Sequence, residues 1–426
     1  MRKYQSRNFK KEYDLGKYAP LYRNSIFSLL KGSRRGGQME PFELDFGPVS
    51  FMVARHFGFC KGVENAIEVA YETLTRNPER RVFMISELIH NSFVNDDLRA
   101  RGLQFIKTAK GQQLIPWSAL QQEDIVITPA FGATREDKQI LEDLGVDLAP
   151  WNATCRFVEN VWFRARELGE MGYTIIVHGK FRHEETLATL SHSQVHAPTV
   201  VVKDMEEARL LADIMSGKQP YEAFHEPFGQ KASAGFDPRT DLRRVAVVNQ
   251  TTMLATETAA ISDYFRSVMI ALHGEDLADE FIANTRDTLC YATKNNQNAT
   301  LQLLEESADL AIVIGGRNSS NTSHLVELCE EKLTTYFIAS ERDILSHREI
   351  LHYDFHSQTE KIISDFLPTR QPARILLTSG ASCPDAIVER VLMKLTRYFD
   401  QIRDLEAVLH PWKEHSEATS KLSLKA

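Results

Sequence analysis

Short apolar stretches alternate with longer amphipathic stretches from residue 49 to residue 399, and this alternation constrains the fold more than any other feature. The apolar stretches are rich in Val, Ile and Phe and end at turn residues, which is typical of buried strands. They predict strands at 49–57, 81–86, 124–132, 173–179, 199–204, 244–252, 309–316 and 373–382. The stretches between them predict helices at 62–76, 92–101, 157–172, 253–268, 291–307 and 385–399. Strands that alternate with helices imply an α/β fold with parallel sheets and crossover helices.

The length of the chain, 426 residues, indicates two or three domains. Residues 1–49 precede the first predicted strand and form an extension with a Gly-rich break at 32–37. Residues 216–242 are richer in Gly, Pro and charge and are interpreted as an insertion, and the tail after residue 400 as a loosely packed helix. In an α/β fold ligands gather beyond the carboxyl ends of the strands, so chemically active residues are expected directly after strands.

Charge and hydropathy exclude several classes of protein. The formal net charge of −8 argues against a general nucleic-acid binder. No apolar run reaches the length that spans a membrane, and the start of the chain lacks the apolar core of a signal peptide. The first 35 residues carry ten Lys and Arg against two acids, which favours a solvated basic arm over a transit peptide. A cytoplasmic location is expected, or the plastid stroma if the source is a plant or alga.

Five cysteines, an odd number without any CxxC pair, predict reduced intracellular thiols and disfavour zinc ribbons and ferredoxin loops. Cys60, Cys155 and Cys290 each lie directly before a predicted helix, 95 and 135 residues apart. The helix N-terminus favours a thiolate and should lower the thiol pKa, and thiolates are the ligands of iron–sulfur clusters. A buried apolar role is the alternative for any one cysteine; it is preferred for Cys329, while Cys383 stays open.

Three cysteine ligands would leave one iron of a 4Fe–4S cube without a protein thiolate. An open position marks a catalytic metal rather than a structural one. The long separations between the three cysteines would place such a cluster at a junction of domains.

Eight ordered motifs resemble one family. They are GFCKGVENAIE (58–68), ELIHNSFVNDDL (87–98), ATCRFVENVW (153–162), HGKFRHEETLAT (178–189), NQTTML (249–254), CYATKNNQNA (290–299), VIGGRNSSNTSHL (313–325) and TSGASCPD (378–385). Their order over about residues 50–398 is similar to the 4-hydroxy-3-methylbut-2-enyl diphosphate reductase (LytB) family, which catalyses the last step of the non-mevalonate isoprenoid pathway. The extension and the insertion resemble the longer, plant-like branch of this family.

The resemblance implies three similar α/β units with mostly parallel sheets arranged around a central 4Fe–4S cluster, bound by cysteines that match Cys60, Cys155 and Cys290. It implies a small allylic diphosphate as substrate, isopentenyl and dimethylallyl diphosphate as products, and a ferredoxin or flavodoxin type electron donor. Neither nucleic acid nor membrane is expected as a partner. The expected domains are an N-terminal extension at 1–49, α/β domains at 50–154, 155–289 and 290–398, and a tail at 399–426.

The resemblance also assigns site residues. Glu185 matches the acid that delivers a proton, and a positioned carboxyl group suits that role because a hydroxyl leaves only with a proton. Thr251 is expected to bind the substrate hydroxyl or Glu185. The residues expected to bind the diphosphate are His90, His183, Ser319, Ser320, Asn321 and Ser382.

Each assignment has an ordinary structural alternative. Glu185 is otherwise a surface carboxylate, Thr251 a turn hydroxyl, Ser382 a helix cap and the Asn-Ser-Ser-Asn segment at 318–321 a plain turn. His90 is otherwise a solvated loop histidine. The family motifs favour the functional interpretation in every case.

Two positions depart from the family pattern. Phe131 lies where many short bacterial members carry histidine, so that contact is absent here, and Asn249 replaces a threonine. Two other functions compete with the reductase. A hydro-lyase that uses an open-iron cluster as a Lewis acid would turn over without reductant, and a cluster-bearing redox sensor would leave 183–185 and 318–321 without a purpose.

Overall fold

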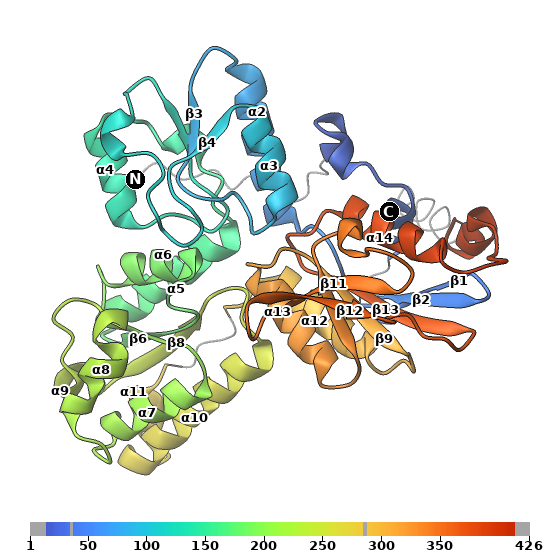
Figure 1. Cartoon of the computed structure of the whole chain (residues 1–426). Coiled ribbons are helices and arrows are strands. Elements are labelled where there is room, and N and C mark those ends of the chain that lie inside the picture. The colour runs from blue at the N-terminus through green and yellow to red at the C-terminus, as the bar shows by residue number, and fades with distance from the viewer. Residues whose placement is uncertain (1–13, 35–36, 284–287, 414–426) are drawn as a thin grey trace, which may run out of the picture. The chain divides into compact units, whose positions relative to one another are not determined.

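The computed structural model describes residues 14–34, 37–283 and 288–413, which form two compact units (Figure 1). The first unit comprises Asn65–Ile89 and Val94–Cys290. The second comprises the described residues 14–64, His90–Phe93 and 291–413. The structure has three sheets that are mainly parallel, two in the first compact unit and one in the second. These three sheets with their helices confirm the predicted α/β class with three similar α/β units. No described helix is both long enough and apolar enough to cross a membrane.

The second unit is built on a five-stranded sheet in the order β1-β2-β13-β9-β10. β2, β13, β9 and β10 run parallel, and β1 pairs antiparallel with β2. These strands span Phe42–Asp45 (β1), Val49–Val53 (β2), Leu310–Ile314 (β9), Thr335–Ile338 (β10) and Ala373–Ser379 (β13). A separate hairpin joins Glu349–Asp354 (β11) to Thr359–Ser364 (β12).

Alternate residues of this sheet face opposite layers of helix, as the period of a strand requires. Ile375 and Leu377 of β13 belong to the core under α1 (Ile26–Gly32) and α14 (Asp385–Thr396). Leu376 belongs to the core under α12 (Tyr291–Leu303) and α13 (Ser320–Glu330). The sheet is therefore buried on both faces, which accounts for the continuous apolar runs in its strands.

The first unit contains two three-stranded parallel sheets. One has the order β4-β3-β5, with β3 at Val82–Met84, β4 at Leu103–Phe105 and β5 at Ile125–Ile127. Its core also takes Leu141 from α4 (Arg135–Asp143). The helices α2 (Lys61–Arg76) and α3 (Ser92–Ala100) begin in residues of the second unit and continue into the first.

The other sheet has the order β7-β6-β8, with β6 at Thr174–His178, β7 at Thr199–Val202 and β8 at Val245–Asn249. α5 (Arg156–Glu170) covers one face, and α7 (Met205–Met215) and α10 (Ala255–His273) cover the other. α6 spans Glu184–Ser193 and α11 spans Ala278–Phe281. The segment 216–242 forms the short helices α8 (His225–Phe228) and α9 (Pro238–Asp241), and its Phe224 and Phe228 are buried in the core under α7.

The first predicted strand, at 49–57, forms β2, which ends at Val53 and pairs in parallel with β13 of the second unit. Local periodicity identifies a strand but says nothing of a partner more than 300 residues away. The expected domain boundaries stay predictions.

The chain before residue 49 is also folded where the structure describes it, so the solvated arm is wrong for residues 14–34. Phe27 and Leu30 of α1 are buried under α14, and Phe42 of β1 is buried in the same core. Near the other end, residues 405–413 are helical as expected, but Val408 and Leu409 are buried rather than loosely packed. In the N-terminal region, the basic charge favoured a solvated arm, and the short helix α1 was therefore not predicted.

Replacing Phe27 by Ala should lower the free energy of unfolding of the second unit by about 3–5 kcal/mol, because it removes a fully buried aromatic ring. Leu301→Ala is the matched control, since Leu301 is exposed on α12 of the same unit and should change stability little. Chemical denaturation followed by near-ultraviolet circular dichroism measures both. Equal, small effects would mean that residues 14–34 do not pack on this core.

Candidate functional site

The second unit gathers five of its six predicted site residues beyond the carboxyl ends of β9 and β13. Ser319 caps α13, because its hydroxyl accepts from the N–H of Thr322 at 3.2 Å. The Ser382 hydroxyl donates to Ser319 Oγ at 3.3 Å and lies 3.4 Å from the carbonyl oxygen of His90. Asn321 Oδ1 accepts from the N–H of Ala381 at 2.9 Å, which joins the two loops.

Two polar atoms of this cluster are buried without a protein partner in the described chain, namely Ser320 Oγ and Asn321 Nδ2. Both residues are at least nine-tenths buried. A buried polar atom without a hydrogen bond costs about 1–3 kcal/mol, so such atoms indicate a place for a polar ligand. Together with the N-terminus of α13, the two side chains suit an anion.

Glycine lets the His90 backbone approach this cluster. A Cβ on Gly316 would lie 1.8 Å from the His90 carbonyl oxygen, and one on Gly380 would lie 2.1 Å from Thr322 Oγ1. No larger residue fits at either position without moving backbone or a buried hydroxyl. Gly316, in the motif at 313–325, and Gly380, in the motif at 378–385, therefore allow close packing around the predicted anion site.

Cys60 lies in the same unit, in the turn between β2 and α2. Its N–H donates to the carbonyl oxygen of Ala381 at 3.3 Å, and its Sγ accepts from the N–H of Val63 at 3.5 Å. Burial raises the pKa of the Cys60 thiol, and the N–H groups of Val63 and Gly62 offset this only in part. The helix N-terminus therefore lowers the pKa of Cys60 as expected, but burial outweighs this effect and the net shift is upward.

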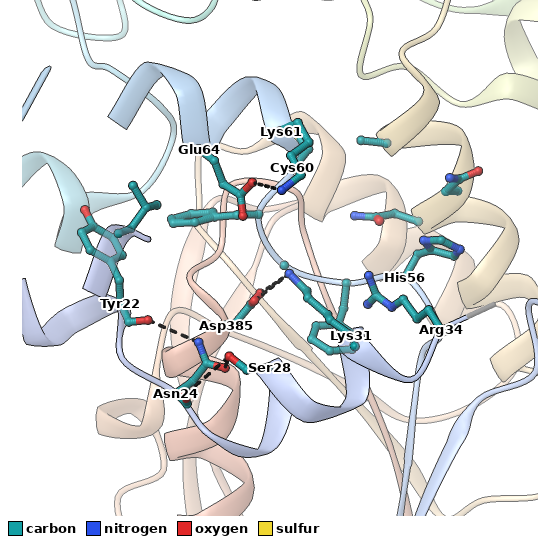
Figure 2. Close-up of a pocket in the computed structure, with 18 of the residues that line it drawn as sticks. Tyr22, Asn24, Ser28, Lys31, Arg34, His56, Cys60, Lys61, Glu64 and Asp385 are labelled. Atoms are coloured by element: carbon teal, nitrogen blue, oxygen red, sulfur yellow. Dashed lines mark hydrogen bonds and ion pairs between the residues drawn. The ribbon is translucent and has the colours of Figure 1, made fainter. Parts of the chain in front are cut away.

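Cys60 opens onto a cavity of about 740 Å³ within the second unit (Figure 2). The cavity is lined by the N-terminal segment, by the turn before α2 and by the start of α12. Its charged lining includes Lys31, Arg34 and Lys61, together with Glu64 and Asp385. None of the predicted diphosphate residues is part of this lining, so the cavity is separate from the cluster around Ser319.

The first unit holds Glu185 in a buried pair with Thr251. Glu185 is 1% exposed, and its two carboxylate oxygens accept from the N–H of Thr251 at 2.6 Å and from its hydroxyl at 3.0 Å. The surface-carboxylate alternative for Glu185 is therefore excluded. Two donors from one residue hold the carboxylate in a single orientation at the carboxyl edge of the β7-β6-β8 sheet.

His183 lies next to this pair at the N-terminus of α6. Its Nδ1 accepts from the N–H of Glu185 at 3.2 Å, so the neutral ring carries its proton on Nε2. Phe131 packs edge-on against the His183 ring, with the ring centroids 5.5 Å apart. Phe131 thus supports the ring of His183 from one side.

Cys155 and Cys290 belong to the same unit as Glu185. Cys155 is the N-cap of α5, and its N–H donates to Ala130 at 2.9 Å, next to Phe131. The N–H of Cys290 donates to the carbonyl oxygen of Thr251 at 3.4 Å. The pair of Thr251 and Glu185 is therefore bonded directly to the turn of Cys290. It is connected to the turn of Cys155 through His183 and Phe131.

The five cysteines fall into two groups. Cys60, Cys155 and Cys290 are half-buried, whereas Cys329 and Cys383 are buried. Burial raises the pKa of Cys329 to about 12 and that of Cys383 even further, which suits inert core thiols. Among the residues that the structure describes, no three His, Cys, Asp or Glu side chains are grouped to hold a metal ion, so shared ligation by the three half-buried cysteines stays a prediction.

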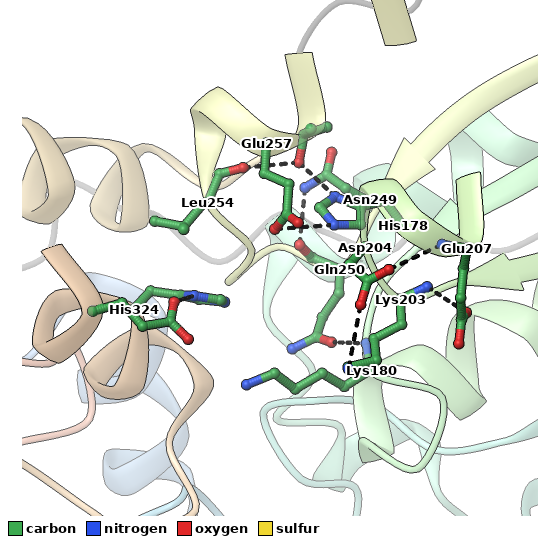
Figure 3. A network of polar contacts seen from close by, with 12 residues as sticks. His178, Lys180, Lys203, Asp204, Glu207, Asn249, Gln250, Leu254, Glu257 and His324 are labelled. Atoms are coloured by element: carbon green, nitrogen blue, oxygen red, sulfur yellow. Dashed lines mark hydrogen bonds and ion pairs between the residues drawn. The ribbon is translucent and has the colours of Figure 1, made fainter. Parts of the chain in front are cut away.

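Gln250 was not singled out from the sequence, although it is the second residue of the NQTT motif. Its Oε1 accepts from the N–H of Lys180 at 3.1 Å and from the Thr186 hydroxyl at 2.9 Å. Figure 3 shows it between the turns after β6 and β8. Gln250 therefore ties the loop of His183 to the turn of Thr251.

Two further contacts steady the same turns. His178 is fully buried at the end of β6, with Nδ1 2.9 Å from the hydroxyl of Thr258 and Nε2 3.6 Å from Glu257 (Figure 3). The N–H of Asn249 donates to the hydroxyl of Thr288 at 3.0 Å, two residues before Cys290. The Thr288 hydroxyl in turn donates to Oδ1 of the Asn249 side chain, so the departure at Asn249 supplies an acceptor that helps to hold the segment before Cys290.

Replacing Thr251 by Val should lower the free energy of unfolding of the first unit by about 1–3 kcal/mol, because Glu185 loses a donor while it stays buried. Thr251→Ser keeps the hydroxyl and serves as the control. Urea denaturation compares the two variants. A valine variant as stable as the serine variant would mean that the pair does not hold the carboxylate.

The chain is similar to known proteins of one family. The LytB protein model matches residues 51–396 of the chain. The 4-hydroxy-3-methylbut-2-enyl diphosphate reductase of Synechococcus sp. strain CC9311 is 40% identical over 356 residues, which cover 83% of this chain and 87% of that protein. The reductase of the same name from Thermosynechococcus vestitus is 40% identical over 350 residues, covering 82% of this chain and 85% of that protein.

One solved structure has a similar fold. It is the E-1-hydroxy-2-methyl-but-2-enyl-4-diphosphate reductase from Plasmodium falciparum, with a TM-score of 0.59 and 21% identity. The match covers 82% of this chain and 88% of that protein. These figures support the α/β fold described above.

Proposed function

The chain belongs to the LytB family, and on that premise we propose that it reduces 4-hydroxy-3-methylbut-2-enyl diphosphate to isopentenyl and dimethylallyl diphosphate, the last step of the non-mevalonate isoprenoid pathway. The observation that carries the proposal is the buried Glu185 carboxylate, held by Thr251 beside the turn of Cys290. A carboxyl group held so firmly next to a potential cluster ligand suits proton delivery at a reducing centre.

Cys60, Cys155 and Cys290 would hold one 4Fe–4S cluster. They are the half-buried thiols, and the Sγ of Cys60 accepts an N–H hydrogen bond of the kind that tunes such clusters. The two remaining cysteines are buried. When bound, the cluster would pass on the electrons of the reaction and offer one iron without a cysteine ligand.

The diphosphate would be bound by the side chains around Ser319, together with His90 and His183. Ser320 Oγ and Asn321 Nδ2 are buried and lack a partner in the described chain, and phosphate oxygens would supply one. Ser319 and Ser382 add hydroxyls, and the N-terminus of α13 adds backbone N–H groups. His183 would donate from Nε2, and His90 would add a second imidazole.

Glu185 would be the catalytic acid. The substrate C–OH bond breaks, two electrons and two protons are consumed, and a C–H bond and water are formed. Glu185 would give one proton to the leaving hydroxyl, and Thr251 would keep the carboxyl group oriented toward it. The electrons would come from a ferredoxin or flavodoxin type donor in the cytoplasm or, in a plant or alga, the plastid stroma.

Iron content tests the ligand set. After anaerobic reconstitution, the wild-type chain should hold about four iron atoms, and Cys60→Ser, Cys155→Ser and Cys290→Ser should each lose most of them because a thiolate ligand is missing. Cys329→Ala removes a thiol from the core and should keep the iron. Mössbauer spectroscopy with and without substrate should reveal one distinct iron that responds to substrate. Full iron binding in all three serine variants would refute the ligand set.

Glu185→Gln should keep the cluster and lower turnover by about 100- to 10,000-fold, the usual contribution of a positioned acid. Glu184→Gln, one residue earlier on α6, is the matched control and should retain turnover. Anaerobic turnover with a chemical reductant measures both variants. Near-normal turnover in Glu185→Gln would remove Glu185 from its role, and turnover without any reductant would favour a hydro-lyase.

A further inference from the structure

The N-terminal segment of the second unit contacts the three residues that precede Cys60. The ring of Phe27 packs edge-on against Phe57, with centroids 4.9 Å apart, and the ring of Tyr22 lies 6.0 Å from that of Phe59. The cations of Lys31 and Arg34 lie over the Phe57 ring, 5.3 Å and 4.9 Å from its centroid. Four side chains from residues 22–34 thus touch the turn that leads to Cys60.

An ion pair ties the same segment to the middle of that turn. Lys31 Nζ lies 2.7 Å and 2.6 Å from the two carboxylate oxygens of Asp385, at the start of α14. Gly58 has a φ of +71°, and a Cβ there would lie 1.8 Å from Asp385 Oδ1 and 3.2 Å from Lys31 Nζ. The ion pair therefore lies directly against the Gly58 backbone, two residues before Cys60. Figure 2 shows the pair of Lys31 and Asp385.

The segment and the turn are both anchored on the rest of the unit. Glu389 of α14 accepts from the N–H groups of Ser25 and Ile26 at 2.9 Å and 2.8 Å, which fixes the start of α1. On the opposite side of the turn, Gly58 donates to the Ser379 hydroxyl at 3.0 Å, and Cys60 donates to Ala381. The turn is thus held between the end of β13 and the N-terminal segment.

The segment also brings positive charge to the cavity that Cys60 lines. Burial lowers the pKa of Arg34 to about 10, so the side chain stays charged at neutral pH, and its Nε and Nη2 have no acceptor among the described residues. His56 lines the same cavity as Arg34 and Cys60. Burial, with Arg34, Arg55 and Lys31, lowers the pKa of His56 to about 4, so it is neutral and does not add to the charge.

We infer that residues 22–34 position the Cys60 turn, with Lys31 as a positioning residue that acts through Asp385 and Gly58, and that Arg34 supplies a charge that raises the reduction potential of the bound centre. The second part rests on the proposed function, because it requires a cluster on Cys60. A fixed positive charge favours the more reduced, more negative state of a nearby centre. The first part concerns the polypeptide alone and can be tested without metal.

Hydrogen exchange of the metal-free chain tests the positioning. In Lys31→Met, amide exchange of residues 57–60 should become about tenfold faster, because the turn loses the ion pair that lies against Gly58. Lys31→Arg keeps the ion pair and should restore slow exchange. Lys361→Met, which removes an exposed ion pair with Asp354 in the same unit, is the matched control and should leave residues 57–60 unchanged. Unchanged exchange in Lys31→Met would overturn the positioning role.

The midpoint potential of the reconstituted protein tests the role of the charge. Arg34→Met should lower this potential, and Arg34→Lys should keep it close to that of the wild type. Equal potentials in the wild type and Arg34→Met would overturn this part. Faster exchange in Lys31→Met, combined with no iron in any variant, would support the positioning of the turn and count against the proposed cluster.

Discussion

Parallel pairing of β13 with both β2 and β9 is the interaction on which the second unit depends. It aligns Leu377 with Val53 and Ser379 with Ile314, so three strands end at nearly the same level. The loops that follow them carry Cys60, the Ser319 cluster and Ser382. Because parallel strands share one carboxyl edge, segments more than 300 residues apart are brought to one place. The β7-β6-β8 sheet does the same for His183, Glu185 and Thr251.

Each of these edges is held by polar contacts that leave little freedom to the side chains. Glu185 is buried and receives two hydrogen bonds from Thr251, and Gln250 joins the turns on which both depend. Around Ser319, glycines admit the backbone of His90, and Asn321 joins the loop after β9 to the loop after β13. Chemistry that needs a proton at a defined atom benefits from such rigidity, because no reorganisation is required during the reaction.

The N-terminal segment shows how a region can contribute to a site without containing any of the expected site residues. Its charge suggested a solvated arm, yet α1 packs on α14 and its side chains surround the turn before Cys60. Burying Arg34 and Lys31 beside that turn costs desolvation, which Asp385 offsets for Lys31.

The sequence by itself determined the α/β class, most of the strands, six of the longer helices, the family, and that Cys60, Cys155 and Cys290 each lie next to the start of a helix. These follow from local periodicity, turn residues and ordered motifs, all of which lie in short windows of sequence. Only the tertiary structure decided that β2 pairs with β13, that the N-terminal segment folds onto α14, and that burial raises rather than lowers the pKa of Cys60. Such outcomes depend on partners hundreds of residues away and on how much water the packed chain excludes, and no local pattern encodes either quantity.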